Sequence, residues 1–169
     1  SRAQVMELLR FFKMRVPGFE NARLAATATQ IGIRESRRIV GEYTLTANDV
    51  REARHFPDAV ARSAYPIDIH NPTGSGTTTV RLPQGRAYEI PYRCLVPLEI
   101  ENLAVAGRCI STTHEAHATT RLTPTVMTLG QAAGTAAALS LANDTPFRRV
   151  DTSLLCEQLV ADGVDLRHT

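Results

Sequence analysis

The sequence predicts an α/β protein, with mixed α and β elements, in which helices flank a strand-rich middle. Three observations lead to this prediction. Apolar residues recur at helical spacing over 3–15, alternating and β-branched residues are frequent over 23–90, and residues 126–141 are mostly Ala, Gly, Leu and Thr. A chain of 169 residues with 43% hydrophobic residues can bury the core of one compact unit.

Two helices are predicted in the first third of the chain. Residues 3–15 place apolar side chains on one helical face, and Pro17 ends that helix. A short second helix is expected over 46–54. There the Thr46 side chain can accept from the Asp49 N–H while the Asp49 carboxylate reaches back, which is the arrangement of a capping box.

The middle of the chain is expected to be rich in strands. Residues 23–45 predict an antiparallel pair with a charged connection at 34–38, and residues 58–63 predict a turn of helix. The turn at Gly85 suggests a hairpin. Further strands are predicted over 65–69, 77–82, 87–90 and 103–106.

The last third of the chain is expected to contain a polar loop, a long buried helix and a terminal helix. The loop opens at Gly107, and the long helix has Thr123 as its N-cap and Pro124 at its first position. Such a helix start is a positive electrostatic end. The terminal helix begins at 151–153, and its buried face is predicted to hold Leu154, Leu155, Leu159 and Val160.

Composition excludes several classes of function. The net charge of +2 comes from 19 basic and 17 acidic residues that are interleaved, so nucleic acid is not an expected partner. The three cysteines lack metal or redox spacing and are expected to be reduced and buried, and no metal site is predicted. The longest apolar run, 132–142, is too short to span a bilayer, and with no signal peptide in view we expect a soluble, cytoplasmic protein.

Several stretches together resemble one known family. The chain resembles the FAD-dependent oxidoreductases that share the glutathione-reductase type of two-dinucleotide-fold architecture, and the resemblance covers most of its length. The matching segments are IGIRESRRIVGEYTLTANDV (31–50), YPIDIHNPTG (65–74), YEIPYRCLVP (88–97), NLAVAGRCIS (102–111), THEA (113–116), Arg121, and Pro124 leading to GQAAGTAAA (130–138).

The resemblance implies FAD as cofactor and hydride removal from a small-molecule substrate. The GxGxxG element that seats the ADP half of FAD is missing from these residues, so we expect the C-terminal portion of a longer protein whose N-terminal FAD-binding part completes the site. Residues 1–97 are then the substrate-side region, and residues 98–169 return to the FAD-binding domain. The alternative is a non-catalytic structural or interaction domain that retains the scaffold. The sequence does not determine the oligomeric state.

The resemblance also suggests which residues hold the cofactor. Gly107 can let the backbone approach the ribityl chain or pyrophosphate, and the helix start can face the part of the flavin where negative charge develops. Arg108 either pairs with an anion or forms a surface salt bridge. The predicted FAD-binding residues are Gly107, Arg108, Thr123, Pro124 and Thr125.

Two groups of residues are candidates for the chemistry. His114 and Arg121 are the predicted catalytic residues, with a structural histidine and a surface salt bridge as the respective alternatives. His70, Tyr92 and Arg93 are the predicted substrate-binding residues, and a structural role is the alternative for each of them. The arginines at 34, 37 and 38 either bind an anionic substrate or form a solvated hairpin tip.

Overall fold

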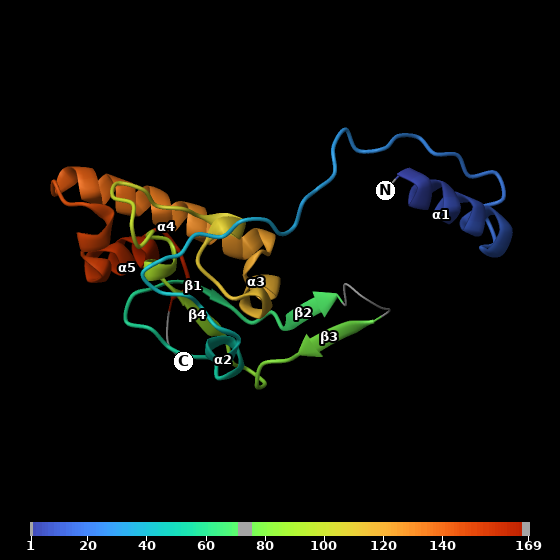
Figure 1. Ribbon diagram of the computed structural model, residues 1–169. Coiled ribbons are helices and arrows are strands. Elements are labelled where there is room, and N and C mark those ends of the chain that lie inside the picture. Colours follow the sequence, from blue (N-terminus) through green and yellow to red (C-terminus); the bar gives the residue numbers. More distant parts are fainter. Residues whose placement is uncertain (1, 71–75, 167–169) are drawn as a thin grey trace. The chain divides into compact units, whose positions relative to one another are not determined.

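The computed structural model describes residues 2–70 and 76–166, apart from the side chain of His70, and confirms the mixed α/β class. The chain divides into two compact units, one ending at Ile33 and one beginning at Arg34. The elements in chain order are α1 (Arg2–Arg15), α2 (Ala47–Arg51), β1 (Ala59–Ser63), β2 (Ile67–His70), β3 (Thr77–Val80), β4 (Tyr88–Pro91), α3 (His114–Thr120), α4 (Thr123–Ala142) and α5 (Thr152–Ala161) (Figure 1).

The first unit consists of α1 and the segment that follows it. The predicted helix over 3–15 is confirmed, but none of its residues is buried. The ring of Phe12 in α1 stacks on the ring of Phe19, which follows the helix, with 5.2 Å between the ring centroids. The helix therefore forms from local sequence without a core of its own.

In the second unit, the four strands belong to one long excursion of the chain. β1 and β2 run out, β3 and β4 return, and the antiparallel pairs are β1 with β4 and β2 with β3 (Figure 1). The predicted strands over 65–69, 77–82 and 87–90 are thus confirmed as β2, β3 and β4 with small shifts of their ends. A turn does form at Gly85, which has a φ of +75°, but the predicted hairpin there is wrong because β3 and β4 pair with other strands.

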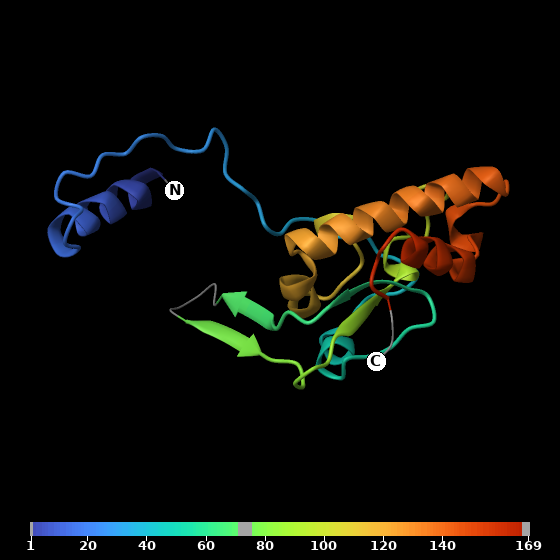
Figure 2. The same cartoon turned by 180° about the vertical axis from the view of Figure 1, so that it is seen from behind.

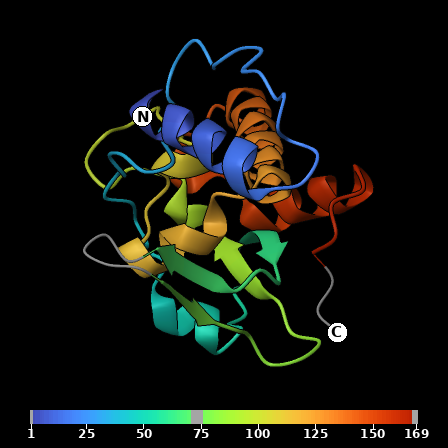
Figure 3. The same cartoon turned by 90° about the vertical axis from the view of Figure 1, so that its right-hand side faces the viewer.

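The core of this unit lies between the β1 and β4 pair and the two C-terminal helices. α4 and α5 lie side by side and both pack against β1 (Figure 2 and Figure 3). Both predicted domains supply core side chains, and the boundary between residues 97 and 98 stays a prediction. The largest fully buried apolar side chains are Leu45, Ile67, Tyr88, Ile90, Tyr92, Leu95, Ile110, Leu129, Leu155 and Leu159.

Residues 23–45 contain no strand, only isolated bridges at Gly41 and Leu45, so the predicted antiparallel pair is wrong. Their backbone groups bond to a distant part of the chain instead: Ile39 N–H donates to the Cys109 carbonyl at 2.9 Å, and Leu45 N–H to the Ser111 carbonyl at 3.1 Å. A glycine is needed at position 41, because a Cβ there would lie 2.7 Å from the Ser111 Cβ. The backbone N–H groups of Ile39 and Leu45 find their acceptors about 70 residues away. The alternation of apolar and polar residues therefore did not indicate the pairing of the segment.

Two further predictions about local structure are corrected. Most of the predicted turn of helix over 58–63 is strand β1 instead, because the buried Ala59 and Ala61 pair with Pro91 and Ile90 of β4. Residues 103–106 form no strand, since in the described chain their one backbone bond to another segment runs from Val105 N–H to the Leu95 carbonyl at 2.9 Å.

One predicted helix cap is confirmed and another is shifted by one residue. The capping box of Thr46 and Asp49 is confirmed at α2. At α4 the N-cap is Leu122 rather than Thr123, so Thr123 is the first helical residue and Pro124 the second. In α5, Leu155 and Leu159 are buried as expected, whereas Leu154 and Val160 are 44% and 46% exposed.

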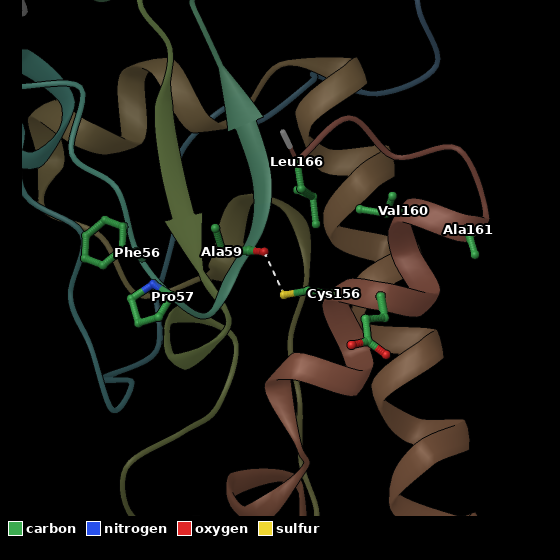
Figure 4. A pocket seen from close by; sticks show the side chains of 8 residues that line it. Phe56, Pro57, Ala59, Cys156, Val160, Ala161 and Leu166 are labelled. Atoms are coloured by element: carbon green, nitrogen blue, oxygen red, sulfur yellow. Dashed lines mark hydrogen bonds between the residues drawn. The ribbon is translucent and has the colours of Figure 1, made fainter. Parts of the chain in front are cut away.

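The cysteines are all free, and only one of them is fully buried. Burial raises the pKa of Cys94 to about 12. Cys109 and Cys156 are half-buried, which corrects the prediction for these two. The Cys156 thiol donates to the Ala59 carbonyl at 3.2 Å, beside an open apolar pocket of about 460 Å³ between α5 and Phe56 (Figure 4). Across the described residues, no helix combines the length and apolar character needed to cross a membrane.

Candidate functional site

The residues predicted to form a polar loop lie partly on a helix. A 3-10 turn at Gly107–Cys109 is followed by α3, whose N-cap Thr113 accepts from Ala116 N–H at 3.4 Å. His114 is therefore the first residue of α3, and Arg121 follows its last turn. The rigid elements on either side fix the positions of both predicted catalytic residues.

Glu35 is the centre of the polar cluster beside α3. Its Oε1 accepts from Arg38 Nη1 at 2.6 Å and from His114 Nδ1 at 2.8 Å, although His114 itself is 56% exposed. Burial acts to raise the pKa of Glu35, but the hydrogen bonds from His114 and Arg38 outweigh it and lower the pKa. Glu35 is thus ionised, and it holds the His114 ring by one nitrogen.

His117 faces the other oxygen of the same carboxylate from inside the protein. Its side chain is fully buried, and its Nε2 lies 2.8 Å from the Arg108 carbonyl oxygen, which can only accept. Nδ1 has no hydrogen bond and lies 3.9 Å from Glu35 Oε2. Burial is the main cause that lowers the pKa of His117, so the ring is neutral with its proton on Nε2.

Arg121 contributes a positive charge near His117, on which the charge of Arg38 also acts. Its Nε is buried and has no hydrogen-bond partner in the described chain. Burial is the main cause that lowers the pKa of Arg121, and the positive charge of Arg34 lowers it further. Glu35 and Asp68 act in the opposite direction. The guanidinium is therefore an incompletely matched cation next to the start of α4.

The predicted cofactor-binding residues lie on two elements, the turn at Gly107 and the start of α4, where Thr125 is buried. Gly107 has a φ of +81° and free space where a Cβ would be. α4 has no side-chain cap at its N-terminus, so the N–H groups of its first turn are available to an anion. An uncapped helix start and a glycine with open space fit the negatively charged parts of FAD.

The predicted substrate-binding residues already have protein partners. Tyr92 is buried and its hydroxyl donates to the Phe147 carbonyl at 2.9 Å, while Arg93 donates twice to Asp58, at 2.9 and 3.2 Å. His70 ends β2, and its side chain lies outside the described part of the structure. A role in substrate binding stays a prediction for all three.

Sequence reasoning did not select two central residues. Glu35 was hidden in a run of charged residues, and its partner His114 is 79 positions away. His117 stands three residues after His114, on the same helical face, and this spacing was the available signal. No group of three metal-binding side chains occurs among the residues described.

The chain matches the model of one protein family along most of its length. Residues 1–159 match the family described as FAD dependent oxidoreductase. No curated protein and no solved structure matches the chain. The chain therefore belongs to the FAD dependent oxidoreductase family.

Proposed function

We propose that this chain forms the flavin-facing and substrate-facing part of an FAD-dependent oxidoreductase that removes a hydride from a small organic substrate. The supporting observation is the set formed by the Gly107 turn, the α3 cluster around Glu35 and the uncapped start of α4. Family membership supports oxidoreductase chemistry and FAD as the cofactor. The ADP half of FAD is assigned to an N-terminal part of the same protein.

In this proposal the start of α4 and the Gly107 turn hold the cofactor. The free N–H groups of Thr123 and Thr125 bind negative charge, and the missing Cβ at Gly107 admits the cofactor close to the backbone. Arg108 supplies a guanidinium from the same turn. FAD, when bound, supplies the acceptor for the hydride.

His114 is assigned to the substrate proton. When the substrate is an alcohol or an amine, loss of a hydride from carbon is accompanied by loss of a proton from its oxygen or nitrogen. Since Glu35 engages Nδ1 of His114, Nε2 is the atom that takes this proton. His117 acts through the backbone, because its bond to the Arg108 carbonyl holds the 107–109 turn against α3.

The first test measures FAD bound to the protein expressed from its complete coding sequence. We expect a yellow protein with flavin absorbance. The variant Thr123→Glu adds a negative charge at the first position of α4, where helix stability tolerates it but bound FAD is repelled, so FAD content is expected to fall by at least about tenfold.

The matched control is Ser153→Glu, which adds the same charge in the first turn of α5 and is expected to retain FAD. A folded wild-type protein that is colourless and fails to bind added FAD would contradict the proposal and favour a non-catalytic domain. Equal FAD content in both variants would show that α4 does not face the cofactor.

A further inference from the structure

Arg121 is a cation without a matching anion in the described structure. Its Nε is buried and makes no hydrogen bond, and no carboxylate of the residues described lies within ion-pair distance of it. A guanidinium nitrogen that has lost water and gained no acceptor costs free energy, because the buried donor remains unsatisfied. Such a group is expected where a ligand supplies the acceptor.

Arg34 adds to this imbalance. It lies at the start of the second unit, is exposed, and is close enough to Arg121 for its charge to lower the pKa of that guanidinium after burial has done so. Two guanidinium groups that repel each other at a partly dry position destabilise the ligand-free protein. They stabilise an anion that binds to both.

The neighbouring carboxylates do not compensate both arginines. Glu35 already accepts hydrogen bonds from Arg38 and His114 through one oxygen. Asp68 acts on Arg121 only at a distance, without an ion pair. Glu35 is shared between Arg38 and His114, and Asp68 forms no ion pair with Arg121, so neither carboxylate neutralises Arg121 by direct contact.

We propose that Arg34 and Arg121 bind a monocarboxylate, and that the small organic substrate of the oxidoreductase carries this carboxylate group. The planar fork of a guanidinium matches the two oxygens of a carboxylate. A carboxylate brings one negative charge to this position, whereas a phosphate would bring a second negative charge toward Glu35. The identity of the bound group as substrate rests on the proposed function, but the binding site itself does not.

The test measures acetate binding to the full-length protein by saturation-transfer difference NMR on the acetate methyl signal, with ionic strength held constant by sodium chloride. We expect saturable binding to the wild type and a Kd at least about tenfold higher in both Arg34→Gln and Arg121→Gln. Arg37→Gln is the matched control, because Arg37 is exposed in the same segment and is expected to leave the Kd unchanged.

Arg34→Gln keeps the test decisive if Arg121→Gln fails to fold, because Arg34 is exposed. Absence of acetate binding to the wild type, or equal Kd values in all variants, would overturn the proposal. Displacement of acetate by inorganic phosphate at a concentration below the Kd of acetate would also overturn the proposal, because it would indicate a phosphate site. The NMR signal needs no flavin, so a colourless protein that binds acetate contradicts only the proposed oxidoreductase function.

Discussion

Two clusters of charged residues in the second unit differ in how completely their charges are matched. In the first, which we call the matched cluster, Asp49 accepts from Arg54, Tyr43 and Thr46, and Asp58 accepts twice from Arg93. In the second, which we call the unmatched cluster, Glu35 accepts hydrogen bonds from Arg38 and His114. Arg34 and Arg121 have no carboxylate partner of this kind among the described residues.

The difference separates structural polar groups from candidate functional ones. In the matched cluster, burial acts to raise the pKa of Asp49, and its hydrogen bonds with Thr46, Arg54 and Tyr43 outweigh burial and lower the pKa. In the unmatched cluster, burial and Arg34 lower the pKa of Arg121, so the folded state disfavours the charged form. Folding alone explains the matched cluster, whereas the proposed carboxylate ligand is our explanation for the unmatched one.

The largest expected effect is the loss of Asp49. Asp49→Ala removes the capping box and leaves Arg54 and Tyr43 without their acceptor, so the free energy of unfolding should fall by about 3 kcal/mol. Chemical denaturation measures this change. Asn48→Ala, an exposed neighbour on the same helix, should change stability by less than about 0.5 kcal/mol. A loss below about 1 kcal/mol for Asp49→Ala would show that the matched cluster contributes little.

A smaller loss is expected for Glu35. Glu35→Gln removes the carboxylate that accepts hydrogen bonds from Arg38 and His114. The neighbouring arginines then repel one another, so the free energy of unfolding should fall by about 1 kcal/mol. Added salt should reduce this loss, because screening weakens the repulsion. Denaturation at low and high salt checks both points, and a loss that does not depend on salt would contradict the electrostatic explanation.

Arg121 is expected to show the opposite sign. Without a carboxylate ligand, Arg121→Gln removes a desolvated, repelled cation and should leave stability unchanged or raise it by about 0.5–1 kcal/mol. The matched control is Arg93→Gln, which deprives the buried Asp58 of its partner and should destabilise the protein. If both variants destabilise equally in denaturation experiments, the two clusters do not differ in the way described.

The smallest expected effect is a pH dependence that comes from His117. Its pKa is lowered in the folded state, so the unfolded chain takes up the proton first as pH falls through about 6.5, and stability decreases until the folded ring is also protonated. His117→Gln should remove this decrease between pH 7.5 and 5.5. Denaturation at three pH values checks it, and an unchanged slope would show that His117 titrates as in the unfolded chain.

Local signals predicted the elements whose stabilising contacts lie close in sequence. Helix α1 follows from its own periodicity, and the capping box of α2 joins residues three positions apart. The cluster around Glu35 could not be predicted in this way. His114 and Arg121 were selected from their place in the predicted polar loop and from their side-chain chemistry, but Glu35 contacts His114 across 79 positions, and no local pattern encodes that contact.

By itself, the sequence determined the mixed α and β class, the short capped helix, the long helix with proline near its start, and the resemblance to FAD-dependent oxidoreductases, which the family match confirms. These features depend on neighbouring residues or on motifs read along the chain. Only the tertiary structure decided that residues 34–45 bond to residues 93–113, that β1 pairs with β4, and that the guanidinium of Arg121 remains unmatched. Each of these depends on which distant group satisfies a buried donor or charge, and chain folding alone brings such groups together.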